Sequence, residues 1–386
     1  MHVHAAYTLE DLDIHAEAWD RLSLAAPQRT PLLSHAWVSS YLEHLLRPGE
    51  KWFCLFAYAD RKLVGVLPVI DQPGQAALYG GRRFHAPSDL DARTGDLLLA
   101  NGHESEAAAA LLAEFKRMEP EYAVLRLDNL PPESPSLQIL QDGFGGCRIF
   151  KESSGCGSHL KIGGSPKAYM ASLSSNFRSN LKRANNRLAR LGGSDALFLM
   201  GSDITGEHMQ RFFDLEASGW KGQAGSAILS SERHTAFFTS LVRRLHARGM
   251  LEWHFLRAGD KLLAGHMAVR TGDKLTLWKL AYNEEYSQCA PGNLLFERLV
   301  HRSFADGTTE IDLVTNFAWY SKWRMQDRPY CNLIISSPRL APYLGNIAAL
   351  TASASLRLLR ESVKKSPTLS AVAYRVRDIV RAQARA

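Results

Sequence analysis

Three strand-like segments joined by tight turns lie between Leu251 and Asn283, and they restrict the possible folds more than any other feature of the sequence. The stretch LEWHFLRAGDKLLAGHMAVRTGDKLTLWKLAYN holds three apolar runs, interrupted at Gly259-Asp260 and Gly272-Asp273. Short Gly-Asp breaks between such runs are typical of hairpin turns. The pattern predicts a three-stranded meander, followed by a helix (PGNLLFERLVHRSFADG) and two further strands (TEIDLV and YCNLIISS).

A similar order of segments occurs earlier in the chain. Two apolar runs flank Asp60-Arg61-Lys62, as in a hairpin, and a helix (SEAAAALLAEFKRM) and a strand (YAVLRLDNL) follow them. Helical segments are expected to precede the hairpin in both halves. A length of 386 residues exceeds what one ordinary core accommodates. We therefore expect an α/β protein built as a tandem repeat.

The boundaries of the units follow from composition. The segment DGFGGCRIFKESSGCG, rich in Gly and Ser, is expected to join two units. This places one domain at residues 1–150 and a second at 151–340. Residues 341–386 form a separate tail with eight Lys or Arg and two acidic residues, which accounts for +6 of the chain's net charge of +7. The tail has helical apolar faces and could pack on the body, lie on a membrane surface or bind an acidic partner.

Several classes of protein are excluded or disfavoured. Since the body is nearly neutral, the basic composition is poor evidence for a nucleic-acid-binding body. No apolar run is long enough to span a membrane, and no signal peptide is expected. Five scattered cysteines fit the cytoplasm, and no metal site is expected because His and Cys never cluster at ligand spacing. The sequence also lacks G-x-S-x-G, Walker and H-E-x-x-H motifs.

The stretch NFRSNLKRANNRLARLGG, residues 176–193, predicts a helix with five basic side chains and no acidic one. Phe177, Leu181, Ala184, Leu188 and Leu191 are expected to form its apolar face. Like charges at helical spacing repel one another. The positive face is either simply solvated or offset by an anion such as a phosphate, and Arg178 and Lys182 are the first candidates to bind that anion.

Three further segments carry candidate site residues. Glu216 closes a helix, and Trp220 and Lys221 are expected to begin a loop between glycines, where the Trp could stack on a substrate or plug the helix end. Pro291-Gly292 begins a helix whose backbone N–H groups could bind phosphate, although such helix starts are common.

In the third segment, Asp312 lies in the strand after that helix. Tyr320, Lys322 and Trp323 come next, as a cation between two aromatic residues. Strand ends of α/β sheets are frequent ligand sites. The alternative is a packed loop with a structural ion pair.

Together these motifs resemble a known family. FRSNLKR from Phe177, LEASGWKGQAG around Trp220, APGNLL at Ala290, Asp312 and YSKW at Tyr320 occur in the order seen in CelD/BcsL-type proteins. Those proteins belong to the GCN5-related N-acetyltransferase (GNAT) superfamily and are similar to the Fem aminoacyl transferases. The motif resemblance covers about 165–335, and residues 1–150 look like a degenerate GNAT-like half.

The resemblance implies tandem GNAT-like domains, each a mixed, mainly antiparallel sheet flanked by helices, and acyl transfer from a thioester to an amine. In such folds a central strand splays from its neighbour to bind pantetheine, and the next helix start takes the diphosphate. Carried over here, Leu280 and Tyr282 on the strand and Pro291, Gly292, Asn293 and Leu294 at the helix start would bind acetyl-CoA or another acyl-CoA. The family's usual glycine-rich loop is replaced by QCAPG at 288–292.

The roles expected for the other residues follow from the chemistry. The acceptor amine must lose a proton, for which Asp312 is the first candidate and Glu216 the second. Tyr320 would protonate the leaving thiolate, and Lys322 would hold an anionic group of the acceptor. Trp220, Lys221 and Trp323 complete the expected substrate site.

We expect a small amine acceptor, such as an amino sugar or amino acid, in polysaccharide or lipid biosynthesis. The alternatives are a Fem-like transferase using aminoacyl-tRNA and a non-catalytic GNAT-like module. The location is expected to be the cytoplasm or the inner face of the membrane.

Overall fold

The computed structural model describes residues 1–73, 81–88, 94–141 and 143–339, together with Pro342, Leu344, Gly345, Ile347 and Ala348. Nearly all of the predicted tail, 341–386, lies outside the described residues. The first half contains strands β1 (His2–Ala6), β2 (Lys51–Ala59), β3 (Lys62–Gln72), β4 (Arg82–His85), β5 (Leu98–Leu99), β6 (Tyr122–Leu130) and β7 (Arg148–Lys161). Its helices are α1 (Leu9–Ile14), α2 (Ala16–Ala25), α3 (His35–His44), α5 (Glu104–Met118) and α6 (Pro135–Ile139), with 3-10 turns η1 (Pro31–Leu33) and η2 (Phe144–Gly146).

The second half repeats this order of elements. Its strands are β8 (Asp195–Met200), β9 (Leu251–Ala258), β10 (Lys261–Thr271), β11 (Lys274–Tyr282), β12 (Glu310–Asp312) and β13 (Gln326–Ser336). Its helices are α7 (Pro166–Ser172), α8 (Ser175–Arg190), α9 (Gly206–Ser218), α10 (Trp220–Gln223), α11 (Glu232–Ala247) and α12 (Pro291–Ala305). The 3-10 turns are η3 (Gly201–Asp203), η4 (Ile228–Ser230), η5 (Glu284–Cys289) and η6 (Ala318–Trp323).

The two halves share one strand topology. In the first, β1, β2, β3 and β4 pair antiparallel in sequence order, and β4 then pairs parallel with β6 after the crossover through α5. In the second, β8, β9, β10 and β11 do the same, and β11 pairs parallel with β12 after α12. The predicted meander in the second half, the predicted hairpin around Asp60-Arg61-Lys62 and the tandem α/β fold are therefore confirmed.

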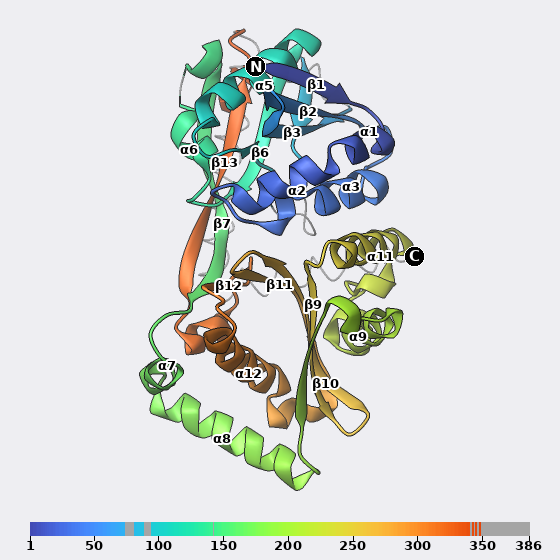
Figure 1. Cartoon of the computed structure of the whole chain (residues 1–386), viewed down its shortest axis with the longest axis vertical. Coiled ribbons are helices and arrows are strands. Elements are labelled where there is room, and N and C mark those ends of the chain that lie inside the picture. The colour runs from blue at the N-terminus through green and yellow to red at the C-terminus, as the bar shows by residue number, and fades with distance from the viewer. Residues whose placement is uncertain are drawn as a thin grey trace, which may run out of the picture.

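The halves are joined by an exchange of strands. β13, from the second half, pairs with β6 of the first, and β7, from the first half, pairs with β12 of the second. β7 and β13 also pair with each other from Arg148 to His159, so the described strands form one continuous sheet. Figure 1 shows these two long strands running between the upper and lower halves. The predicted domain boundary at residue 150 falls inside β7.

The basic segment forms helix α8, as predicted, and packs its apolar face on the second core. Phe177, Leu181, Ala184 and Leu188 are buried, in one cluster with residues of α12. The prediction was wrong for Leu191, which is exposed because it is the C-cap residue at the end of the helix, beyond the contact. In Figure 1, α8 lies beside α12 at the end of the molecule opposite the N-terminus. The helix is thus fixed by burial of one face, while the basic face is exposed.

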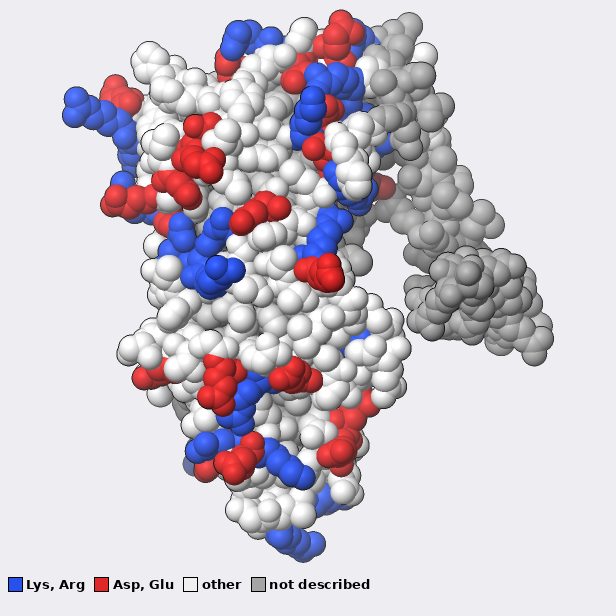
Figure 2. Space-filling view, turned by 90° about the vertical axis from the view of Figure 1, so that its right-hand side faces the viewer, with Lys and Arg blue, Asp and Glu red and all other residues white. Residues whose placement is uncertain are grey.

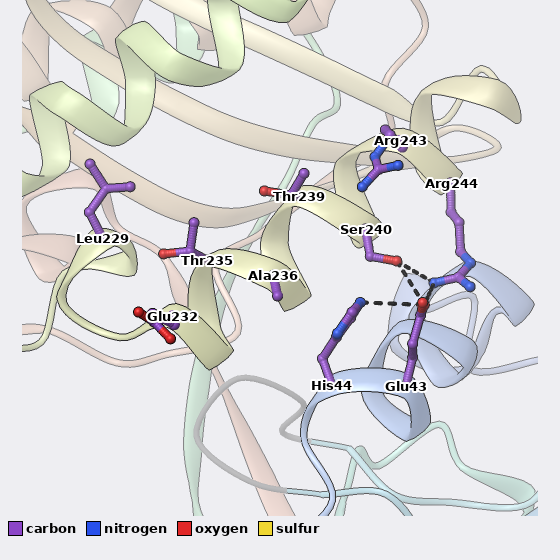
Figure 3. A pocket seen from close by; sticks show the side chains of 10 residues that line it. All are labelled: Glu43, His44, Leu229, Glu232, Thr235, Ala236, Thr239, Ser240, Arg243 and Arg244. Carbon is purple, nitrogen blue, oxygen red and sulfur yellow. Dashed lines mark hydrogen bonds and ion pairs between the residues drawn. The ribbon is translucent and has the colours of Figure 1, made fainter.

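A polar interface holds α11 of the second half against α2 and α3 of the first. Arg248 donates to Asp20 Oδ2 at 2.6 Å and Arg244 to Glu43 Oε2 at 2.7 Å. Figure 3 shows Glu43 on α3 meeting Ser240 and Arg244 on α11, at the edge of a groove of about 590 Å³. On the face drawn in Figure 2, basic and acidic side chains are interspersed. Ion pairs of this kind are strongest where they are partly desolvated.

His35 lies buried at this interface in a defined tautomer. Its Nδ1 accepts from Arg248 Nη2 at 2.7 Å, while Nε2 lies 3.1 Å from Asp13 Oδ1. Since a guanidinium only donates, Nε2 must carry the proton of the neutral ring. Burial, with further contributions from Arg248 and Arg244, lowers the pKa of His35 to about 3.

We predict that His35 makes the protein less stable in acid. Below pH 6.5, the ordinary pKa of about 6.5 lets the unfolded chain bind a proton at His35 that the folded chain does not bind. Stability is therefore retained above about pH 6.5 and decreases as the pH is lowered further. The loss from pH 7 to pH 5 should be about 2 kcal/mol from this residue. Thermal unfolding at both pH values should show a smaller acid-induced drop in Tm for His35→Gln, whereas His301→Gln, at an exposed position, should behave as the parent. An equal drop in all three would contradict the assignment.

Candidate functional site

Strands β11 and β12 separate soon after they meet. Their parallel pairing joins Lys274, Leu275 and Thr276 to Glu310, Ile311 and Asp312 and ends there, whereas β11 continues to Tyr282. On its other side β11 stays paired with β10, with a bulge at Trp278 where the register shifts. The second half of β11 therefore has one paired edge and one edge turned away from the sheet.

Leu280 presents its backbone to the open edge. The N–H of Asn283 bonds to Leu263 O on the β10 side at 2.8 Å. Because neighbouring residues of a strand direct their backbone groups to opposite edges, those of Leu280 point the other way. There, Leu280 O accepts from Lys221 Nζ at 3.0 Å. The N–H of Leu280 points to the same side, toward any ligand that lies along this edge.

The N-terminus of α12 opens beside the same edge. Ala290, its N-cap, has a left-handed backbone (φ 45°) and forms no side-chain capping bond. Pro291 has no N–H, so the first donors of the helix are the N–H groups of Gly292 and Asn293. A Cβ placed on Gly292 would meet nothing within 4 Å. The turn thus presents two backbone donors and the positive end of a helix dipole to open space.

A cavity of about 590 Å³ lies between these elements. It is lined by Leu215, Glu216, Gly219, Trp220, Lys221, His266, Trp278, Lys279, Leu280, Ala281, Tyr282, Ser287, Ala290, Pro291, Gly292, Asn293, Val314, Thr315, Phe317, Trp319 and Tyr320. The predicted site residues that meet here come from several segments: Glu216, Trp220, Lys221, Leu280, Tyr282, Pro291, Gly292, Asn293 and Tyr320. The size suits a small-molecule site.

Glu216 and Lys221 form an ion pair in the cavity wall. Lys221 Nζ donates to Glu216 Oε1 at 2.7 Å, and Ile228 N–H donates to Oε2 at 2.9 Å. The Glu216 side chain is fully buried. Trp220, expected in a loop, instead begins the short helix α10, with its N–H bonded to Glu284 Oε1 at 2.8 Å. The pair therefore fixes α10 to the open edge of β11 through Leu280.

Aromatic side chains gather at the mouth and floor of the cavity. Trp220, Tyr282 and Phe317 are 55%, 39% and 53% exposed, which is unusual for side chains of this size. Tyr320 is buried, with its hydroxyl 3.2 Å from Thr315 Oγ1. The exposed rings offer a stacking surface, and Tyr320 offers a hydroxyl to the interior.

Six predicted residues do not line the cavity, and the first five lie as follows. Leu294 and Trp323 are buried in the core, although Trp323 Nε1 donates to Asn293 Oδ1 at 3.1 Å and so supports the helix start. Lys322 is exposed on η6, which forms where a loop was expected. Arg178 donates to Leu173 O at 3.0 Å and thereby caps the end of α7. Lys182 is exposed on α8. The ligand-binding roles of these residues remain predictions.

Asp312 is held in a buried charge cluster outside the cavity. Its Oδ2 accepts from Arg328 Nη1 at 2.5 Å and lies 3.1 Å from Lys274 Nζ, while Oδ1 accepts from Val314 N–H at 2.8 Å. Burial alone would raise the pKa of Asp312, but Lys274 and Arg328 outweigh it and hold the pKa below its ordinary value. A carboxylate with both oxygens engaged and a low pKa is a weak base. The geometry therefore favours a structural role.

Sequence reasoning missed several residues that line the cavity, among them His266, Trp278 and Trp319. His266 lies on β10 directly opposite Leu280 and is almost fully buried. Its signal in the sequence was a histidine inside an otherwise apolar strand. Trp278 stacks edge-on against Trp37 of α3, with ring centroids 4.5 Å apart. The first half thus supports the floor of a cavity built by the second.

Comparison with known families gives a match within the second half. Residues 175–322 match the family described as acetyltransferase (GNAT) domain. Strand β11, with its splayed edge, and helix α12, with its open start, lie within the matched segment. No curated protein sequence matches this chain.

Solved structures share the fold over most of the chain. FemX superimposes with a TM-score of 0.60 at 12% identity, covering 88% of this chain and 98% of FemX. The C-terminal domain of a proposed lysylphosphatidylglycerol synthetase from Agrobacterium fabrum gives 0.52 at 11%, covering 91% and 96%. A protein of unknown function from Bacteroides thetaiotaomicron gives 0.52 at 14%, covering 86% and 98%. At these identities the likeness concerns the fold.

We predict that Asp312→Asn weakens the fold and leaves the ligand cavity intact. Removing the Asp312 charge takes one of three carboxylates from the buried Arg328 and one partner from Lys274, at a cost of up to about 3–5 kcal/mol. Asp327→Asn is the matched control, since Asp327 is exposed and bonds only Asn316 among the contacts described, and it should cost less than about 0.5 kcal/mol. Denaturant unfolding measures both. A catalytic Asp312 would give the reverse result, with stability retained and turnover lost.

Proposed function

We propose that this chain is an acyltransferase that moves an acetyl or other acyl group from acyl-CoA to the amine of a small acceptor. The observation that carries the proposal is the early end of β11–β12 pairing beside the uncapped start of α12. This arrangement provides backbone donors for a thioester chain along Leu280 and for a diphosphate at Gly292 and Asn293. The GNAT match over the same segment supports it.

The cavity residues support the steps of such a transfer. The Leu280 N–H, directed to the open edge, would stabilise the charge that develops on the thioester oxygen. The Tyr320 hydroxyl would give its proton to the leaving thiolate. Lys221 and Glu216 hold the open edge in place, and since both oxygens of Glu216 already have partners, it is less suited to remove the amine proton. The exposed rings of Trp220, Tyr282 and Phe317 would contact the acceptor or the donor.

The acceptor we favour is an amino sugar or amino acid, in polysaccharide or lipid biosynthesis, and the reaction is proposed to occur in the cytoplasm or at its membrane face. All five cysteines are free, as in a reducing compartment. Within the described residues, no helix is long and apolar enough to cross a membrane. A membrane-surface or acidic partner for the tail remains a proposal from its charge.

A second candidate is transfer of an aminoacyl group from aminoacyl-tRNA. The fold similarity to FemX over nearly its whole length favours it, as does the replacement of the usual glycine-rich loop by residues 288–292. Thermal stabilisation separates the candidates, because a ligand that binds only the folded state raises Tm. Stabilisation by acetyl-CoA supports the first, and salt-sensitive binding of tRNA supports the second. A lack of both responses would favour a non-catalytic module.

We predict that Gly292→Glu weakens acetyl-CoA binding. The new side chain would project into the space at the helix start, and its charge would repel a diphosphate. Calorimetric affinity should fall at least about tenfold, which corresponds to about 1.4 kcal/mol.

Gly206→Glu is the matched control. Gly206 also stands in the first turn of a helix, α9, where an added Cβ would meet nothing within 4 Å, but it does not line the cavity. The affinity of this variant for acetyl-CoA should equal that of the parent. Equal weakening in both variants, or in neither, would argue against a diphosphate site at α12.

A further inference from the structure

A row of buried polar side chains crosses the sheet and ends in the cavity. Glu252 and His254 lie on β9. His266, on β10, lies directly opposite His254 on one side and Leu280 of β11 on the other. Directly opposite residues of adjacent strands share one face of the sheet. Glu252, His254 and His266 are 2%, 0% and 1% exposed. Buried ionisable groups are rare unless they are paired or functional.

Glu252 fixes the tautomer of His254. Glu252 Oε2 accepts from Arg302 Nη1 at 3.0 Å, and Arg270 bonds Oε1. Burial alone would raise the pKa of Glu252, but hydrogen bonds and the charges around it lower that pKa to about 2, so the group is a carboxylate. A carboxylate only accepts, and His254 Nε2 lies 3.1 Å from Oε2. His254 therefore carries its proton on Nε2, and its Nδ1 is an acceptor.

Two nitrogen atoms in this row lack a protein partner. The Nδ1 atoms of His254 and His266 are both buried and make no hydrogen bond to another protein atom among the described residues. The two rings stand edge to face with centroids 5.8 Å apart. An unpartnered buried nitrogen costs free energy, and a separation beyond direct bonding is commonly bridged by one water. Because His254 Nδ1 can only accept, a bridging water donates one hydrogen to it and keeps its lone pairs free to accept from a protonated His266 Nδ1.

We propose that His266 is the general base of the cavity and that Glu252 and His254 position it through a bridging water. In this arrangement His266 carries its proton on Nδ1, and its Nε2 presents a lone pair to the cavity. His266 is then a catalytic residue, whereas Glu252 and His254 act through it. The catalytic role of His266 rests on the proposed acyl transfer. The tautomers of His254 and His266 do not depend on that function and can be measured separately.

The proton balance of the step is complete. The acceptor nitrogen forms a bond to the acyl carbon and loses a proton to His266 Nε2. The carbon–sulfur bond breaks, and the thiolate takes its electron pair and the proton of Tyr320. The phenolate regains a proton from solvent, to which the imidazolium returns its own. Burial lowers the pKa of His266 well below its ordinary value, with a smaller contribution from His254. The ring is therefore neutral with a free lone pair at neutral pH, and the same low pKa makes it a weak base that passes the proton on at once.

Nuclear magnetic resonance of the full-length protein with 15N-labelled histidine tests the arrangement without turnover. Loss of signals in His254→Gln and His266→Gln assigns the two rings. We expect the proton of His254 on Nε2 and that of His266 on Nδ1, and we expect His254→Gln to shift His266 towards the Nε2-protonated form. A His266 protonated on Nε2 in the parent, or one unaffected by His254→Gln, would overturn the proposal.

Kinetics test the catalytic role. With acetyl-CoA and a panel of amines, thiol release by His266→Gln should fall about 10²- to 10⁴-fold, while affinity for acetyl-CoA changes less than about twofold. His35→Gln, at a buried histidine that does not line the cavity, should keep the parent rate at pH 7.5. Retained thiol release in His266→Gln would overturn the role. If the parent does not bind acetyl-CoA, the proposed function is rejected instead. The tautomers measured by magnetic resonance would then still show whether Glu252 and His254 position His266.

Discussion

The pairing of β7 with β13 is the constraint on which the rest of the structure depends. Each strand begins in one half and ends in the other, so neither half has a complete sheet on its own. Arg328, on β13, reinforces the crossing by bonding Asp312 and Glu310 of β12 and lying 3.3 Å from Glu133 of the first half. Gathering three carboxylates around one buried guanidinium is tolerated because each charge has a partner. The halves are thus joined by the chain itself, by the backbone hydrogen bonds between β7 and β13, and by the buried ion pairs of Arg328.

The cavity results from a conflict between sheet pairing and the path of the chain. β12 is only three residues long, because the chain turns away after Asp312 into the segment that leads to η6. On this side β11 continues beyond Thr276 without a partner strand, and such an open edge would be unfavourable in a simple sheet. Here Lys221 covers the Leu280 carbonyl, and aromatic side chains surround the remainder. Strand edges left open in this way are places where a ligand can complete the hydrogen bonding.

Local patterns predicted most elements but few of the tertiary relationships. The hairpin turns, the amphipathic α8 and the helix beginning at Pro291 could be predicted, since each depends on residues close in sequence. The cap of α7 is equally local, because Ser165 accepts from Ala168 N–H at 3.2 Å. In contrast, Asp312 has the same sequence signature whether it faces a cavity or an arginine sixteen residues later. In the sequence, His266 cannot be distinguished from an ordinary core histidine, because its neighbours His254 on β9 and Leu280 on β11 are set by strand pairing.

By itself, the sequence determined the order of helices and strands, their buried faces and the repeated topology, because periodicity and turn chemistry act over a few residues. It also indicated which segments hold the candidate site. Only the tertiary structure decided that β7 and β13 exchange halves, that β11 separates from β12 after Thr276, and that Glu252, His254 and His266 align toward the cavity. These features depend on pairings between residues distant in the chain, whose free energy comes from burial and charge that no local pattern encodes.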